Sequence, residues 1–217
     1  MIKNNYVITI GRQFGSGGRE LGRLLAEKLG IAYYDKELLG EAAKHSGLNA
    51  EIFERNDERS PSFLSGMFSV SSGYNPIVCY ASSSSITADN IYRAQSDFIR
   101  QLANTQSCVI VGRSADHILR DHPNAINLFI HATMDDCITR IMRRGDKTTP
   151  EQARVIAEKT NKLRASYYNF YTDKKWGDAA SYDLTFNSSR ISIEEIASIV
   201  IDYIYKKFGE PHSISTR

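Results

Sequence analysis

Apolar residues recur along the 217-residue chain in short runs that alternate with helix-like patterns. The runs are rich in β-branched and aromatic side chains, which favours buried strands. Strands that alternate with helices predict a parallel sheet covered on both faces, and so a doubly wound three-layer α/β/α fold. The five strand candidates are residues 6–10, 31–34, 108–112, 126–130 and 182–186.

Helix signals stand between the strand candidates. Leucines at helical spacing over residues 21–29 precede Gly30, a residue type that commonly ends a helix. Thr133 can cap a further helix, with Asp136 three residues on. The capping-box patterns at 149–152 and 192–195 predict two more helices, the first of which runs to about residue 170.

The middle of the chain lacks such a clear pattern. Residues 36–58 are charged and in part helical in pattern, and residues 60–85 are rich in serine and break the periodicity. The serine-rich stretch is interpreted either as a mobile insertion acting as a substrate lid or as a plain disordered loop. Thr87 can cap a long helix that ends near residue 105. No internal repeat is apparent, and we expect a single domain over residues 1–217.

Composition narrows the class of protein. No apolar run reaches the roughly 18–20 residues of a membrane span, and the N-terminus lacks a secretory pattern. Three widely spaced cysteines argue against a disulfide framework and indicate a cytoplasmic protein. The five histidines show no metal-ligand spacing, and the formal net charge of +2 is too small to indicate a nucleic-acid surface. We therefore expect no membrane, nucleic-acid or protein-bound metal partner.

Residues 11–21, GRQFGSGGREL, follow the first strand candidate and open a helix. Small residues there allow backbone N–H groups to enclose a phosphate at the helix N-terminus. Compared with the Walker pattern GxxxxGK[ST], Gly18 occupies the lysine position, and Arg19 or Glu20 occupies the hydroxyl position, depending on register. The loop therefore predicts a phosphate site whose side-chain cation comes from elsewhere, with Arg12 and Arg19 the nearest candidates.

Two other interpretations of the loop remain open. Gly15 and Gly17 supply the first half of the dinucleotide-binding pattern GxGxxG, but Glu20 stands where its third glycine belongs. Asp35 would then have to be the acidic residue that binds the ribose. The loop can also be a structural turn without a ligand. A phosphate loop is the favoured interpretation.

Three polar sequences follow strand candidates: GRQFGSGGRE after the first, YDKE after the second and GRSAD after the third. Ligands of doubly wound sheets bind at the carboxyl ends of the strands. We therefore expect all three sequences to meet at one site.

These motifs, together with YYNFYTDKKWG and YDLTFNSS, resemble the cytidylate kinase-like family, a branch of P-loop nucleoside monophosphate kinases with a modified phosphate loop. The resemblance covers about residues 5–208 and is weakest over 47–88. Ordinary cytidylate kinases have GKG[ST] where this chain has GGRE. The resemblance implies a P-loop kinase-like fold with a five-stranded parallel sheet, an acceptor-binding insertion after strand 2 (36–88) and a lid region after strand 4 (145–178). It also implies ATP and Mg²⁺ as cofactors and nucleotides as substrates.

Candidate residues for each role follow from position and from this resemblance. Arg140 and Arg144 share a helix face and could contact ATP, although cations near a helix C-terminus also stabilise its dipole. By resemblance, Lys162 and Arg164 stand where cytidylate kinases carry lid arginines, and Asn187 is near the adenine. The cofactor-binding candidates are Gly15, Ser16, Gly17, Gly18, Arg19, Glu20, Arg144 and Asn187, and the catalytic ones are Arg12, Arg19, Arg140 and Arg164.

The acceptor candidates lie at the ends of the second and third strands and in nearby helices. Asp116 could orient the acceptor base or organise magnesium, but it is also a typical acidic residue at a helix N-terminus. The aromatic residues between 167 and 176 are interpreted as packing of the lid helix onto the core. The substrate-binding candidates are Asp35, Lys36, Arg93, Arg113, Asp116 and Lys162.

The leading functional hypothesis is ATP-dependent phosphoryl transfer to a nucleoside monophosphate, with CMP or dCMP as the first guess. One alternative is a nucleotide-binding or regulatory protein that has the kinase fold without transfer activity, and Gly18 at the lysine position supports it. A kinase of another small metabolite is a further alternative. The sequence does not indicate the oligomeric state.

Overall fold

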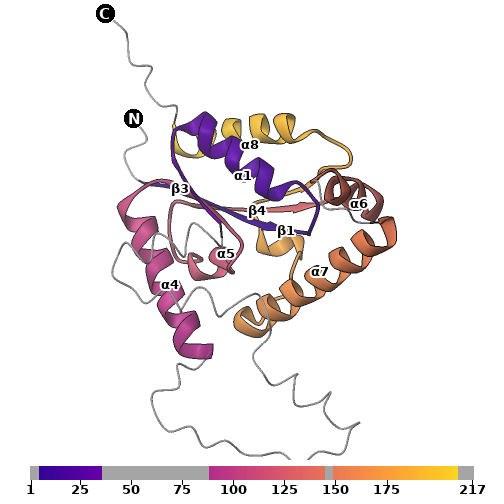
Figure 1. Cartoon of the computed structure of the whole chain (residues 1–217). Coiled ribbons are helices and arrows are strands. Elements are labelled where there is room, and N and C mark those ends of the chain that lie inside the picture. The colour runs from indigo at the N-terminus through magenta and orange to yellow at the C-terminus, as the bar shows by residue number, and fades with distance from the viewer. Residues whose placement is uncertain (1–4, 36–87, 145–148, 210–217) are drawn as a thin grey trace, which may run out of the picture.

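The computed structural model of the chain describes residues 5–35, 88–144 and 149–209 (Figure 1). Within these residues, five strands form one parallel sheet in the order β2-β3-β1-β4-β5. This confirms the predicted five-stranded α/β architecture. The strands are β1 (Val7–Arg12), β2 (Ala32–Tyr34), β3 (Cys108–Val111), β4 (Ala125–His131) and β5 (Leu184–Asn187).

The last strand begins two residues later than the sequence pattern predicts. Residues Ala179–Ser181 form a 3₁₀ turn, η2, and the N–H of Tyr182 donates to the carbonyl of Ala179 at 3.2 Å. Tyr182 therefore closes this turn, and pairing with β4 starts only at Leu184.

The predicted helix ends agree well with the structure. Gly30, with φ of 63°, ends the first helix, and the Thr133 hydroxyl accepts from the backbone N–H of Asp136. Both predicted capping boxes, Thr149 with Gln152 and Ser192 with Glu195, are present. The helices are α1 (Gly18–Leu29), α4 (Ala88–Thr105), α5 (Ala115–Ile118), α6 (Met134–Arg143), α7 (Pro150–Thr172) and α8 (Ile193–Phe208).

Helices cover both faces of the sheet, as Figure 1 shows for α1 and α8 on one side and for α4 and α5 on the other. Side chains of successive strand residues point to opposite faces, so Val7 packs with α4 and α5 while Ile8 packs with α1 and α8. The three central strands β3, β1 and β4 are thus buried on both faces. Because they run parallel, their carboxyl ends lie at the same edge of the sheet.

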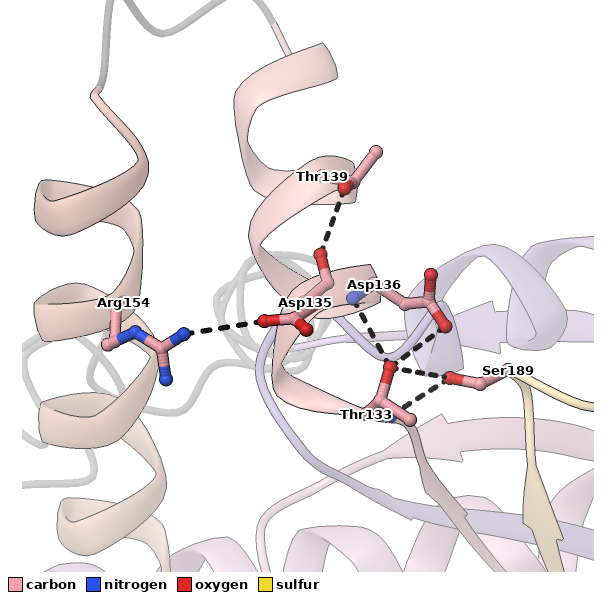
Figure 2. Close-up of polar contacts among 6 residues, drawn as sticks. All are labelled: Thr133, Asp135, Asp136, Thr139, Arg154 and Ser189. Atoms are coloured by element: carbon pink, nitrogen blue, oxygen red, sulfur yellow. Dashed lines mark hydrogen bonds and ion pairs between the residues drawn. The ribbon is translucent and has the colours of Figure 1, made fainter.

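The start of α6 is fixed to its neighbours by polar contacts (Figure 2). The N–H of Thr133 donates to the Ser189 hydroxyl at 2.9 Å, which joins α6 to the segment after β5. Arg154 on α7 pairs with Asp135 at 3.3 Å, but both side chains are exposed, so the pair contributes under about 1 kcal/mol. Apolar packing of Ile141 with Ala157 therefore holds α7 against α6 more firmly.

Several sequence-based expectations lie outside the described residues. These are most of the 36–88 insertion, Lys36, the serine-rich stretch 60–85, the cap at Thr87 and the first four residues of the 145–178 region. Ala88 begins α4, as predicted for the helix after Thr87. In the described part of the chain, no helix has both the length and the apolar character needed to span a membrane.

Candidate functional site

The loop between β1 and α1 is wound tightly at the carboxyl end of the central strand. Gly15 and Gly17 have φ of 82° and 85°, values that favour glycine. The hydroxyl of Ser16 donates to the carbonyl of Gln13 at 2.9 Å, inside the loop. Because Gly17 is the N-cap and has no side chain, no N-cap side chain accepts a hydrogen bond from the first-turn N–H groups of α1. This is the backbone arrangement of an anion site.

A side chain at Gly15 would distort this loop. A Cβ there would lie 2.7 Å from the backbone oxygen of Cys137 on α6, in addition to the cost of positive φ. We expect Gly15→Ala to lower the free energy of unfolding by about 2–4 kcal/mol, as measured by urea denaturation. Gly30→Ala is the matched control, because its φ is 63° and nothing lies within 4 Å of its Cβ position. It should cost only about 1–2 kcal/mol, and an equal loss in both variants would contradict the packing against α6.

A basic pocket opens beside this loop, and we call it the loop pocket. Arg144 and Arg164 bring their guanidinium carbons to 5.9 and 5.5 Å from the ring centre of Phe14. The N–H of Phe14 donates to Asn161 on α7 at 2.7 Å, so α7 is fixed to the loop. The pocket is lined by Arg12, Gln13, Phe14, Gly15, Gly17, Gly18, Arg19, Arg144 and Arg164.

A second pocket lies at the ends of β1 and β3, and we call it the strand-end pocket. Arg12 and Arg164 line both pockets, and Arg164 Nη1 donates to the carbonyl of Arg12 at 3.1 Å. The two pockets therefore adjoin at these two arginines. The lining of the strand-end pocket is Gly11, Arg12, Gly112, Arg113, Ser114, Asp116, Arg164, Tyr167, Tyr168, Trp176 and Tyr182.

The strand-end pocket contains a buried carboxyl group. Asp116 lies in the first turn of α5, 9% exposed, and accepts from the Tyr168 hydroxyl at 2.7 Å. Burial raises the pKa of Asp116 above its ordinary value, and the hydrogen bond from Tyr168 offsets part of that rise. Asp116 is therefore a helix N-terminal acid that also lines the pocket, and its role toward an acceptor or magnesium stays a prediction.

This raised pKa makes stability depend on pH with a definite sign. The folded protein holds the Asp116 proton more tightly than the unfolded chain does, so this stabilisation is present at low pH and is lost as pH rises through the folded-state pKa. Asp116→Asn removes the titration. We expect the Asn variant to gain stability relative to the unchanged protein as the pH is raised from about 4 to 7, measured by thermal unfolding. A constant difference across this range would contradict the raised pKa.

Asp35, a candidate for binding the acceptor substrate, lies beside α1. Its side chain is 2% exposed, and Asp35 Oδ2 lies 3.4 Å from Arg19 Nε and 4.0 Å from the Arg23 guanidinium. Tyr33 also donates to it at 3.3 Å. Arg19 thus lines the loop pocket while its guanidinium is paired with the carboxylate at the end of β2.

Arg140 on α6 does not line either pocket. Its guanidinium donates to the Ser188 hydroxyl at 3.2 Å and to the Ser188 carbonyl at 2.8 Å. Ser188, itself buried, donates to the carbonyl of Ser16 at 2.7 Å. Arg140 therefore supports the loop from α6 through Ser188. Sequence reasoning placed the neighbouring Asn187 near adenine and did not find this contact.

The remaining candidates do not belong to the lining of either described pocket. Arg93 on α4 and Lys162 on α7 are exposed, as is Glu20 in the first turn of α1. Asn187 ends β5, and its side-chain oxygen accepts from the N–H of Ser189 at 3.0 Å.

Aromatic residues have two roles that sequence spacing did not separate. Tyr171 stacks on Tyr92 of α4 at 4.0 Å between ring centres, which agrees with packing of α7 onto the core. Tyr168, Trp176 and Tyr182 instead line the strand-end pocket, and sequence reasoning missed them as site residues. Their positions depend on how α7 and the segment after it pack against the loop, α4 and α5, which no local pattern encodes.

The arrangement places cations in two adjoining pockets. One pocket combines a helix N-terminus with arginines, the other combines Arg113 with a carboxyl group, and Arg12 and Arg164 stand between them. Shared cations between two anions are what transfer of a charged group requires, because they stabilise charge that spreads during the reaction. Among the described residues, no cluster of three His, Cys, Asp or Glu side chains is present to hold a metal ion.

Comparison with known proteins gives concordant results. The model of the cytidylate kinase-like family matches residues 7–190. The cytidylate kinase of Methanosarcina barkeri (strain Fusaro / DSM 804) is 26% identical over 202 residues, covering 90% of this chain and 96% of that protein. A crystal structure of a protein from Eubacterium ventriosum ATCC 27560 has a TM-score of 0.69 and 32% identity, with 92% and 98% of the two chains covered. The shikimate kinase from Bacteroides thetaiotaomicron shares the fold alone, with a TM-score of 0.51, 14% identity and 92% and 98% coverage.

Proposed function

Because the chain belongs to the cytidylate kinase-like family, we propose that it transfers the γ-phosphoryl group of ATP to a nucleoside monophosphate, with CMP or dCMP the first candidates. The family match confirms the resemblance drawn from the sequence motifs. The observation that carries the proposal is that Arg12 and Arg164 line both the loop pocket and the strand-end pocket. Cations between the two pockets can stabilise the charge of a phosphoryl group as it is transferred from one pocket to the other.

The loop pocket is the donor side in this proposal. Its helix N-terminus and its arginines suit the triphosphate of ATP. Mg²⁺ in kinases is bound largely through substrate phosphates with one or two carboxylates, so the lack of a described three-ligand cluster is compatible with it. Glu20 lies outside the pocket lining but directly follows the lining residues Gly18 and Arg19 on α1, and its exposed carboxylate is the candidate to supply an oxygen to the ion. The magnesium ion would neutralise charge on the phosphates.

The strand-end pocket is the acceptor side. Arg113, 3% exposed at the turn after β3, would bind the acceptor phosphate, and Asp116 would accept a hydrogen bond from the acceptor. An oxygen of the monophosphate attacks the γ-phosphorus of ATP, the bond to the β–γ bridging oxygen breaks, and ADP and a nucleoside diphosphate result. A phosphate dianion needs no base to attack, so the residues contribute position and charge. We assign the reaction to the cytoplasm, in keeping with the three widely spaced cysteines.

The proposal is tested by measuring ADP release from ATP and Mg²⁺ against a panel of nucleoside monophosphates and other small hydroxyl metabolites. We expect one pyrimidine monophosphate to stimulate release above the rate without acceptor. Folded protein that no monophosphate stimulates would remove the acceptor assignment, and stimulation by a metabolite alone would favour a different small-molecule kinase.

A second candidate is a protein that binds nucleotide without transferring phosphate. Gly18 at the lysine position favours it, because that lysine normally contacts the β and γ phosphates. Calorimetric titration with ATP distinguishes the candidates. Binding without ADP release supports the second, and binding with acceptor-stimulated release supports the first.

A further inference from the structure

The backbone conformation of Gly18 does not explain why this residue is a glycine. It is the first residue of α1, and it is not among the described glycines with positive φ, so the backbone there accepts any residue. The obstacle is Arg12. A Cβ built on Gly18 would lie 2.6 Å from Arg12 Cβ and 3.1 Å from Arg12 Cγ. The space in which a lysine side chain would begin is filled by the stem of an arginine.

The Arg12 side chain continues from there toward β3. A Cβ on Gly112 would lie 2.9 Å from Arg12 Cζ, so the guanidinium rests directly against this glycine. Gly112 has φ of 84°, and it follows the last residue of β3. The Arg12 side chain thus runs from the end of β1, past the start of α1, to the end of β3, and it lines both pockets on the way.

We propose that Arg12 takes the place of the phosphate-loop lysine and that the two positions are sterically exclusive, with Gly18 required by the arginine. The role toward phosphate rests on the function proposed above. Arg19, the other nearby cation, lines the loop pocket alone, whereas Arg12 lines both pockets, which favours Arg12 as the replacement. A guanidinium can donate two parallel hydrogen bonds to a phosphate, which an ammonium cannot. Where the two pockets adjoin, Arg12 contacts the transferred phosphoryl group between the donor and the acceptor.

Steric exclusion is tested by thermal unfolding of Gly18→Ala in three backgrounds: unchanged, Arg12→Ala and Arg12→Gly. Arg12→Ala keeps the Cβ that collides with residue 18, whereas Arg12→Gly removes it. We expect the substitution to lower the melting temperature in the first two backgrounds. In Arg12→Gly it should raise the melting temperature or leave it unchanged, since alanine is the better helix former. The same shift in all three backgrounds would overturn the exclusion.

Replacement of the cation is tested by calorimetric binding of a non-hydrolysable ATP analogue with Mg²⁺. Arg12→Gly should weaken binding about tenfold or more, as expected for loss of charge-assisted hydrogen bonds. Adding Gly18→Lys to Arg12→Gly restores the lysine of an ordinary phosphate loop. If Arg12→Gly loses about tenfold in affinity, the double variant should regain about twofold or more. The control is Gly18→Lys with Arg12→Ala, where the Cβ still collides and no recovery is expected.

The outcomes separate this inference from the proposed function. If the unchanged protein binds the analogue but Arg12→Gly binds within twofold of it, the role of Arg12 is overturned while the nucleotide site stands. If the Arg12→Gly, Gly18→Lys protein binds no better than Arg12→Gly, the exchange of arginine for lysine is overturned. If the unchanged, folded protein does not bind the analogue, the proposed function fails and the phosphate role of Arg12 fails with it.

Discussion

Arg164→Ala should lower kcat for phosphoryl transfer about 100-fold or more, because an arginine that contacts the transferring group stabilises its transition-state charge. Arg164 is half-buried on α7, lines both pockets and donates to the carbonyl of Arg12 at 3.1 Å. Its guanidinium also lies over Phe14 of the loop. The loss should therefore fall mainly on kcat, measured with ATP and acceptor both saturating.

Arg154→Ala is the matched control on the same helix. Arg154 lies ten positions earlier on α7, is exposed and pairs only weakly with Asp135 at the start of α6 (Figure 2). An exposed pair is worth under about 1 kcal/mol, so kcat should stay within about twofold of the unchanged protein. If Arg164→Ala retains as much activity as Arg154→Ala, Arg164 does not serve the transferred group.

Arg113→Ala should raise the KM for the acceptor about tenfold or more while the KM for ATP changes little. Arg113 lines the strand-end pocket but is absent from the lining of the loop pocket, so its loss should affect one substrate only. Steady-state kinetics with each substrate varied in turn measures the two values separately.

Because Arg113 is 3% exposed, its removal could also disturb the fold, and Arg113→Lys is the second variant. Lysine keeps the charge but loses the planar fork, so it should raise the acceptor KM by less than alanine does. Equal increases in both KM values for Arg113→Lys would contradict the assignment of the strand-end pocket to the acceptor.

Local sequence signals predicted most of the fold. Parallel strands buried on both faces are continuous apolar runs, so β1 and β4 could be found directly. Capping residues such as Thr149 and Ser192 accept hydrogen bonds from N–H groups only three positions further on. They are therefore also local signals, and they predicted the helix starts. The start of β5 was placed two residues early, because η2 and Tyr182 form a turn that the apolar pattern does not distinguish from a strand.

The site was only partly predictable. Glycine spacing after β1 predicted the loop, and convergence of strand ends predicted that Arg12 and Arg113 would lie near one another. The contact between Arg164 and Arg12, 152 positions apart, depends on how α7 packs beside the loop after β1. The support of Ser16 by Ser188 and Arg140 depends likewise on packing among three elements. Such contacts are set by tertiary geometry, so residue spacing could not predict them.

The most direct test of the account follows the phosphoryl group itself. The full chain is incubated with Mg²⁺, CMP or dCMP, and ATP labelled in its γ-phosphoryl group, and the products are separated. The arrangement of two pockets joined by Arg12 and Arg164 predicts that the label appears in the nucleoside diphosphate, and that Arg164→Ala nearly abolishes its appearance. Label found only in ATP or in free phosphate, with every nucleoside monophosphate supplied and the protein folded, would contradict the account.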